Sequence, residues 1–177
     1  ILSGDVTPGG KLPFTIAYND TDYPDFLHIA DNKTEIGYGY YHGYTLFDKK
    51  NIQPQYPFGF GLSYTDFEIT DCTAEKGGDI ITVKATVKNT GNVCGDEVVQ
   101  VYVSSKNNLE DRPVKLLKGF KRVNVDAGES AEVLITVPVD DIKFYDPETG
   151  DWKTDGAYTV MVGTDSRNTV AAGEITF

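Results

Sequence analysis

Residues 79–88, Asp-Ile-Ile-Thr-Val-Lys-Ala-Thr-Val-Lys, decide the fold class of this chain. The odd-numbered positions from Ile81 to Val87 are apolar, and they alternate with threonines and lysines. A period of two places the apolar side chains on one face of a strand and the polar ones on the other. The stretch is therefore predicted to be a half-buried strand with one face in water.

Six further stretches have the length and composition of strands. Residues 97–103 (EVVQVYV) are rich in β-branched side chains at both parities, which is typical of a central strand. Pro147 and Gly150 interrupt what is predicted to be a loop. Seven short strands in roughly 110 residues predict a fibronectin III/immunoglobulin-like β-sandwich over residues 66–177. The other five predicted strands are residues 67–74, 116–125, 131–139, 157–162 and 173–177.

Residues 1–65 have a different composition, with 13 of the 21 aromatic residues and no sustained period. Residues 11–18 are predicted to form a strand with Pro13 at its edge or start, and residues 25–30 a single helical turn. So aromatic a segment does not suit a solvated linker, and such long irregular stretches do not suit a self-contained domain. We therefore interpret residues 1–65 as the tail of another domain, docked on a surface outside this sequence.

Three short motifs stand out in this part: TPGGKLPFT at 7–15, GYTLFD at 43–48 and PFGFGLSYT at 57–65. They resemble, in that order, the N-P-S-G-K-L-P-F-T, G-Y-R-x-F/Y-D and P-F-G-Y-G-L-S-Y-T segments of family 3 glycoside hydrolases of the β-glucosidase type. The first of these lies near the end of that family's α/β-sandwich domain. Thr45 and Tyr38 depart from the pattern, because the family has Arg and the Glu of an E-G pair at these places.

The resemblance continues to the end of the chain, where it is to the family's C-terminal fibronectin type III-like domain. It implies a mainly β fold, with this sandwich at 66–177 preceded by the C-terminal tail of an α/β-sandwich domain at 1–65. The residues that carry it are Asn89-Thr90-Gly91, Val98-Val99-Gln100, Tyr102, Arg112-Pro113, Leu117–Phe120, Gly128-Glu129, Phe144-Tyr145, Trp152 and Tyr158.

The resemblance also implies a function for the whole enzyme, the hydrolysis of β-glycosides with retention by two carboxyl groups about 5–5.5 Å apart. The family's nucleophile is an Asp in an S/T-D-W-like motif of a barrel, and its acid/base, often a Glu, precedes the K-L-P-F segment. Neither has a counterpart here. We expect this chain to hold no catalytic residue, to support the rest of the same glycosidase, and to be inactive alone.

Two alternatives to this interpretation fit the sequence. In the first, the chain is one subunit of a split glycosidase rather than part of a single polypeptide. In the second, it is a stand-alone carbohydrate-binding or interaction module without catalysis. It begins at Ile1 with no leader, which we interpret as a processed chain or a fragment.

An aromatic cluster surrounds His42 in sequence. It is interpreted either as a sugar-binding patch or as a buried seam against the missing domain, and the seam is favoured. Trp152, the sole tryptophan, is expected to fill the sandwich core or cover its edge. The tyrosines of the cluster are Tyr38, Tyr40, Tyr41 and Tyr44.

The remaining candidate sites are interpreted as structural. Residues 146–151 (DPETGD) lack the alternating acids and the final Glu of a calcium loop, so a plain turn is favoured. The glycine pairs 37–39 and 59–61 predict tight backbone packing rather than phosphate binding. The acidic pairs Glu110-Asp111 and Asp140-Asp141 are expected to be solvated, and the sequons at Asn19 and Asn32 to occur by chance.

Charge and cysteine content exclude several classes of function. The net charge of −11 argues against nucleic acid or an anionic membrane as a partner, and no run of ~20 apolar residues spans a bilayer. Cys72 is expected opposite about residue 82 and far from Cys94, which predicts two free thiols. His28 and His42 have no cysteine nearby, so neither a metal nor a cofactor is expected.

Overall fold

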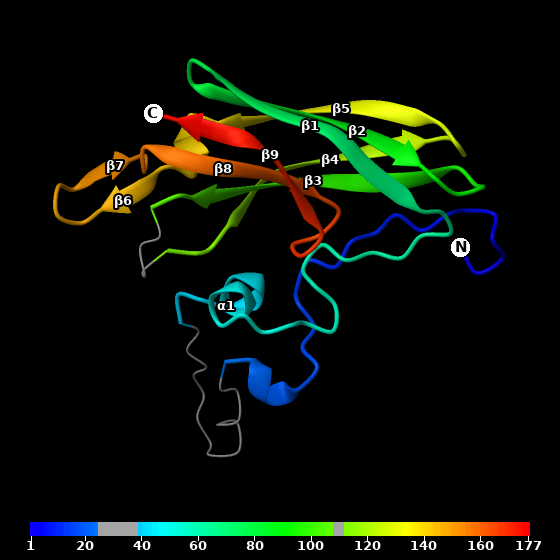
Figure 1. Cartoon of the computed structure of the whole chain (residues 1–177). Coiled ribbons are helices and arrows are strands. Elements are labelled where there is room, and N and C mark those ends of the chain that lie inside the picture. Colours follow the sequence, from blue (N-terminus) through cyan, green and yellow to red (C-terminus); the bar gives the residue numbers. More distant parts are fainter. Residues whose placement is uncertain (25–38, 108–111) are drawn as a thin grey trace.

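Two antiparallel sheets face each other across a common core in the computed structural model, which describes residues 1–24, 39–107 and 112–177 (Figure 1). This arrangement confirms the predicted mainly β sandwich. One sheet has the order β1-β2-β5, formed by β1 (Phe67–Gly77), β2 (Ile80–Asn89) and β5 (Ser130–Pro138). The other has the order β4-β3-β8-β9, formed by β3 (Gly95–Ser105), β4 (Leu116–Val125), β8 (Ala157–Gly163) and β9 (Thr169–Thr176).

The core lies between the two sheets and is built from alternate residues of each strand. In β2 every apolar side chain predicted to face inward is buried, from Ile81 to Val87. Leu134 of β5, which points the other way, is 48% exposed. The period of two therefore correctly predicts which face of these strands is buried. The facing sheet contributes Val99, Val101, Val160 and Val162.

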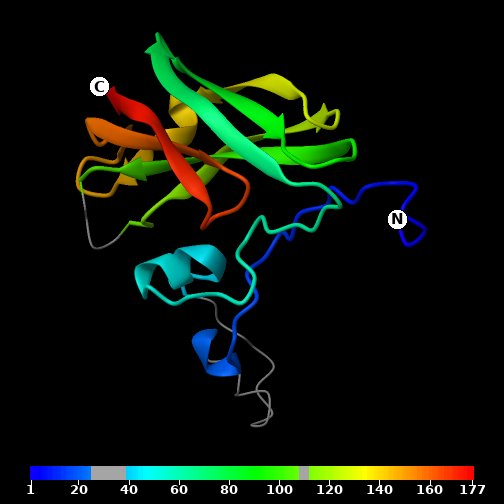
Figure 2. The same ribbon diagram turned by 45° about the vertical axis from the view of Figure 1, so that its right-hand side comes forward.

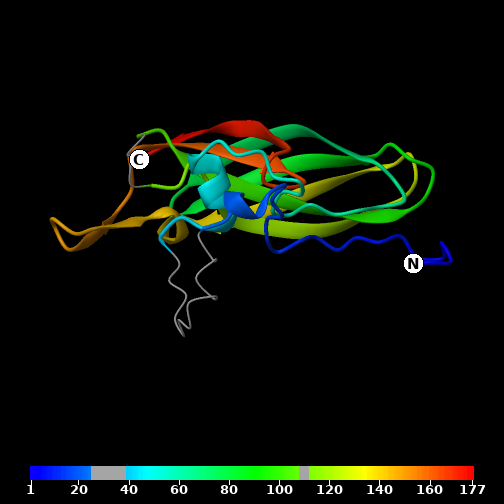
Figure 3. The ribbon, with the colours of Figure 1, turned by 90° about the horizontal axis from the view of Figure 1, so that it is seen from below.

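A short hairpin was not predicted. Strands β6 (Phe144–Asp146) and β7 (Asp151–Lys153) pair where the sequence predicted a loop, and the 3-10 turn η3 (Val139–Ile142) precedes them. Three residues are too few to display a period, which explains why the pattern failed here. The hairpin projects from the body of the sandwich when the molecule is seen from below (Figure 3).

The position predicted for Cys72 is wrong by a few residues. A bulge in β1 shifts the register with β2 between Thr70 and Thr73, which pair with Thr86 and Lys84. Cys72 therefore lies opposite residues 84–86 rather than 82. Most of this difference comes from the turn, because β1 runs on to Gly77, which pairs with Ile80, whereas the predicted strand ended at Ala74; the bulge itself shifts the register by only one residue. Cys72 and Cys94 are both free thiols.

Residues 1–65 are here called the leading segment, and the part of them that the structure describes contains little regular structure. The predicted strand at 11–18 is wrong, because this stretch makes a single bridge between Ile16 and Tyr56. A helix that was not predicted, α1 (Gly43–Lys49), buries Leu46 and Phe47; the 3-10 turn η1 is Asp20–Asp22. The helical turn predicted at 25–30 lies outside the described residues. No helix in the described part of the chain is both long and apolar enough to cross a membrane.

The leading segment lies beneath the sandwich in two views, with α1 next to the four-stranded sheet (Figures 1 and 2). It covers the outer face of β3, where Gln100 and Tyr102 are almost completely buried. This explains why apolar residues occur at both odd and even positions of β3. Part of the surface on which the leading segment docks therefore lies within this chain, whereas the sequence predicted a surface outside it.

Candidate functional site

The P-F-G motif of the leading segment meets β3 at the side chain of Gln100. Its amide nitrogen donates to the carbonyl of Gly59 (3.3 Å) and to that of Thr164 (2.6 Å), and its oxygen accepts from the hydroxyl of Tyr102 (2.6 Å). Gly59 has φ +82°, and a Cβ there would overlap the Gln100 amide. The glycine pair 59–61 thus serves tight backbone packing, as predicted.

Tyr44 joins α1 to the same place. Its ring packs against Phe58 at 4.9 Å and edge-on against Tyr102 at 6.1 Å, and its hydroxyl accepts from the Leu117 amide (3.0 Å). Burial raises the pKa of both tyrosines, which keeps both hydroxyls protonated at neutral pH. The aromatic seam predicted around His42 exists at Tyr44, but it packs against this chain's own sandwich.

The other members of that cluster lie elsewhere. Tyr40 is 69% exposed, and Tyr41 packs edge-on against it and beneath the ammonium of Lys49. His42 is the N-cap of α1, where the hydroxyl of Thr45 donates to its carbonyl (2.8 Å). Thr45, which replaces the family's Arg, thus helps to close the first turn of the helix. Tyr38 lies outside the described residues.

A buried carboxylate fastens α1 to the sandwich. Asp48 has a 3% exposed side chain, and its oxygens lie 2.7 Å from Nζ of Lys115 and 3.3 Å from a guanidinium nitrogen of Arg167. Arg167 also donates to the carbonyl of Ile52 (2.7 Å). A buried charge needs a partner of opposite sign, so these two cations fix the place of Asp48.

The contact between the leading segment and β3 around Gln100 is here called the junction. The K-L-P-F and P-F-G motifs pair with each other along its edge. The Leu12 amide donates to the Phe60 carbonyl (2.7 Å), and the Gly59 amide donates to the Leu12 carbonyl (2.8 Å). Lys11 forms an ion pair with Glu97 of β3 at 2.6 Å, and both side chains are largely buried. These contacts bring the two motifs, which lie about 45 residues apart in the sequence, into one structural unit.

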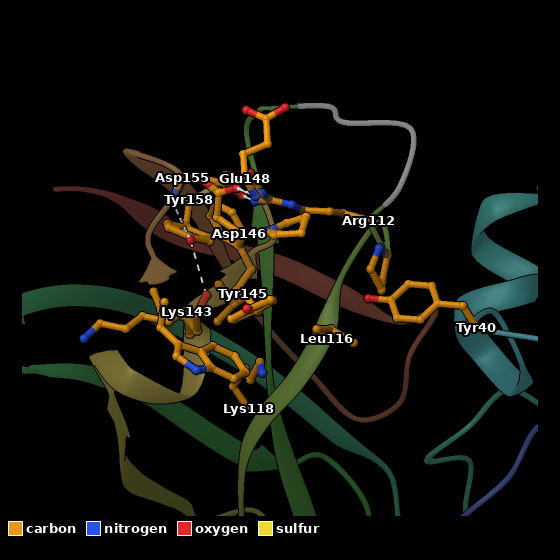
Figure 4. Close-up of a pocket in the computed structure, with 17 residues that line it drawn as sticks. Tyr40, Arg112, Leu116, Lys118, Lys143, Tyr145, Asp146, Glu148, Asp155 and Tyr158 are labelled. Carbon is orange, nitrogen blue, oxygen red and sulfur yellow. Dashed lines mark hydrogen bonds and ion pairs between the residues drawn. The ribbon is translucent and has the colours of Figure 1, made fainter. Parts of the chain in front are cut away.

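A large groove of about 990 Å³ lies beside the junction, between the β6–β7 hairpin, β4 and Tyr40 (Figure 4). Side-chain contacts tie its inner wall together: Arg112 forms an ion pair with Asp155, and its guanidinium stacks 3.1 Å from the ring centroid of Phe144. Tyr158 donates to the Ile142 carbonyl (3.2 Å). Burial lowers the pKa of Lys118, which donates to the carbonyl of Asp141.

Trp152 lies on this groove and not in the core. It is 65% exposed, and its ring meets that of Tyr145 edge-on at 5.8 Å. Of the two places predicted for Trp152, the core is therefore wrong, because the hairpin that carries it projects away from the sheets (Figure 3). The other prediction, a position over the edge of the sandwich, agrees better with its place on the groove beside the edge strand β4. A lone tryptophan carries no period, so the sequence offered no signal of this position.

The acidic candidates are structural where they are described. The carboxylate of Asp146 accepts from the Glu148 amide and from Lys153, which makes residues 146–151 the turn of the β6–β7 hairpin. Asp140 is exposed and pairs with Lys143. The described residues contain no cluster of three metal-binding side chains. Glu110-Asp111, His28, the sequon at Asn32 and the glycine pair 37–39 lie wholly or partly outside them, and Asn19 is exposed.

Comparison with known proteins places this arrangement in a family. Residues 97–166 match the fibronectin type III-like domain. A β-glucosidase of Kluyveromyces marxianus is 40% identical over 98% of this chain and 21% of its own length, and its crystal structure superposes with a TM-score of 0.88, covering 99% of this chain and 22% of that one. The crystal structure of the GH3 β-glucosidase of Bifidobacterium adolescentis superposes with a TM-score of 0.83 at 36% sequence identity, covering 100% of this chain and 27% of that one.

This chain spans about a quarter of the length of the curated relatives that it matches, including probable β-glucosidase M of Aspergillus niger. The likeness extends over both the leading segment and the sandwich, because nearly the whole chain is covered in each comparison. The chain belongs to the family 3 glycoside hydrolases of the β-glucosidase type, as part of their C-terminal region.

Proposed function

We propose that this chain is the supporting part of a longer enzyme that hydrolyses β-glycosides, β-glucosides first among them, with retention at the anomeric carbon. One observation carries the proposal. Nearly the full chain matches β-glucosidases at 36–40% identity, yet it accounts for only about a quarter of their length. The remaining length has ample room for the catalytic carboxylates, which retaining enzymes place about 5–5.5 Å apart.

The supporting role follows from the junction around Gln100. The sandwich offers a rigid face on which the leading segment is held by Gln100, Asp48 and Glu97. The leading segment also exposes large apolar side chains, which suit contact with the rest of the enzyme. We propose that residues 1–65 complete an α/β-sandwich domain there. The exposed side chains are Phe14, Tyr18, Leu62 and Tyr64.

The chain alone is expected to be inactive. The family's nucleophile motif and the acid/base that precedes K-L-P-F have no counterparts in this sequence. The carboxylates of the junction, Asp48 and Glu97, are each neutralised by a lysine and buried beneath the leading segment. Such side chains are poorly placed to protonate a leaving group or to attack an anomeric carbon.

A hydrolysis assay tests the proposal. The natural polypeptide that contains this chain is assayed on 4-nitrophenyl β-glucoside, beside the 177-residue chain alone and with the α-glucoside as a control. We expect turnover of the β-glucoside by the natural protein only, and NMR of the first product should show the β-anomer. Turnover by the chain alone, or no β-glycoside hydrolysis by the natural protein, would contradict the proposal.

A stand-alone carbohydrate-binding module is the second candidate, favoured by the exposed Trp152 and Tyr145 at the groove. It predicts that the natural protein has no hydrolase activity and consists of this chain only. The apolar surface of the leading segment argues for the first candidate, since an independent module would leave that surface in water.

A further inference from the structure

The groove beside the β6–β7 hairpin is separate from the junction around Gln100. Neither the supporting role nor any contact between the motifs of the leading segment uses its exposed side chains. Three aromatic residues border it with their rings largely in water: Tyr40 (69% exposed), Tyr145 (52%) and Trp152 (65%). Large apolar side chains gathered around one concave surface are unusual enough to indicate a ligand.

The rings do not form a flat platform. Tyr145 and Trp152 are inclined at 64°, with their centroids 5.8 Å apart, and Tyr40 comes from the leading segment on the far side of the groove (Figure 4). Two inclined rings with a third ring opposite suit a ligand that enters between them. A flat crystalline surface would contact only one of these rings at a time.

The polar lining is of mixed charge. Two lysines and two acids border the groove, and a further pair of charges, Arg112 and Asp155, compensate each other. The four are Lys118, Lys143, Asp146 and Glu148. A surface without a dominant sign gives no preference for an anion or a cation. It does offer both hydrogen-bond donors and acceptors around apolar rings, which is the complement of a neutral ligand rich in hydroxyl groups.

We propose that this groove binds one chain of a soluble, neutral β-linked oligosaccharide at least two pyranose rings long. The C–H faces of the sugar stack on Trp152 and Tyr145, and its hydroxyls bond to the charged groups at the rim. The volume of about 990 Å³ is at the upper end of the range for ligands of this size. The choice of a β-linked sugar rests on the proposed function; the choice of a neutral, single-chain ligand rests on the groove itself.

Tryptophan fluorescence tests the proposal directly, because Trp152 is the only tryptophan in the chain. The 177-residue chain is titrated with cellotetraose, with laminaritetraose and, as an α-linked control, with maltotetraose. A saturable change of emission with a β-linked sugar, and a weaker one or none with maltotetraose, is the expected result. No change with any of the sugars, or an equal change with all three, would overturn the proposal.

Variants separate stacking from unspecific effects. Tyr145→Ala should weaken binding about tenfold, because one stacking ring is worth about 1.4 kcal/mol. Phe120→Ala is the matched control, since Phe120 is 68% exposed on β4 but does not line the groove, and it should leave the titration unchanged. An equal loss in both variants, or none in Tyr145→Ala, would contradict the assignment.

Trp152→Ala lacks the fluorescent probe, so its binding of the β-linked sugar is measured by calorimetry. Its affinity should fall at least as much as that of Tyr145→Ala. Pull-down on crystalline cellulose should retain little protein, and strong retention would contradict the single-chain ligand. The titration needs no catalysis. Its failure therefore leaves the proposed function standing, and a failed hydrolysis assay leaves the groove proposal standing.

Discussion

The two parts of this chain are held in place by different physical means. In residues 66–177 long antiparallel ladders join the strands, and alternate side chains fill one core between the sheets. The described part of the leading segment has one isolated bridge, a seven-residue helix, a 3-10 turn and a core cluster of three buried residues. It is attached to β3 and its neighbours mainly by individual side chains, beside a backbone hydrogen bond from the Ser166 amide to the Phe58 carbonyl. The first arrangement spreads its stability over many residues, whereas the second concentrates it in a few.

The contrast predicts that removal of the Asp48 carboxylate destabilises the docking of the leading segment more than any other change considered below. Asp48→Ala leaves Lys115 buried without its counter-charge, and breaking a buried ion pair from one side costs about 3–5 kcal/mol. We expect this loss in the docking of the leading segment, measured by hydrogen exchange at the amides of Lys50 and Ile52. Glu132→Ala breaks the exposed pair with Lys84 and should cost less than ~1 kcal/mol. Equal effects of the two substitutions would contradict the contrast.

A core substitution should act on both parts together. Ile81 is completely buried, and Ile81→Ala should lower the free energy of unfolding by about 2–5 kcal/mol, as measured by denaturant titration. The leading segment should unfold with the sandwich, because its docking surface is β3. Ile80→Ala changes the same residue type on the opposite, exposed face and should cost about 1 kcal/mol or less. A leading segment that stays protected in Ile81→Ala would show that it folds independently.

A single glycine tests the contact between the P-F-G motif and β3. Gly59→Ala introduces a Cβ at φ +82° and against the Gln100 amide, which should cost about 1–3 kcal/mol. Gly128→Ala separates the two causes, because Gly128 has a similar φ of +77° but nothing within 4 Å of the added Cβ. Thermal unfolding should show the larger loss for Gly59→Ala. Equal losses would mean that the Gln100 contact contributes nothing.

The smallest effect concerns pH and the β6–β7 turn. A hydrogen bond from Lys153, aided by the Glu148 amide and the Thr149 hydroxyl, lowers the pKa of Asp146 to about 2. Because the unfolded value is about 3.9, the carboxylate stabilises the turn above that pH, and this stabilisation is lost as pH falls through about 2. Emission from nearby Trp152 should thus stay constant down to about pH 4 and change below it.

Asp146→Asn is the control for this titration, because an amide does not ionise in this range. The variant should lack the acid transition of Trp152 while the far-UV signal of the sheets stays the same in both proteins. If the transition persists in the variant, another group controls the hairpin.

The sequence predicted the sandwich well because its signal is local. Burial on one face imposes a period of two, and β2 and β5 are long enough to show it. The hairpin of β6 and β7, with three residues in each strand, and the two-turn helix α1 are too short to show a period. Residues 11–18 were predicted as a strand but form only one bridge, between Ile16 and Tyr56. Pro13 lies in this stretch and has no amide hydrogen to donate to a neighbouring strand.

The junction was foreseen only as motifs and not as contacts. The resemblance picked out Gln100, Tyr102 and the P-F-G segment without indicating that they touch, because pairing between residues 41 apart leaves no trace in local spacing. The groove was missed altogether. Tyr40 lies more than a hundred residues before the hairpin that carries Tyr145 and Trp152, so the three rings meet only in the folded molecule.

The mass of the natural protein tests the central claim most directly, that this chain supports a larger glycosidase through its leading segment. Denaturing mass spectrometry is applied to the β-glucoside-hydrolysing protein purified from its source. We predict that these residues occur in a polypeptide about four times longer, or beside a second chain that carries the barrel, because the relatives are four to five times the length of this chain. A complete, lone chain of 19.4 kDa would contradict the account.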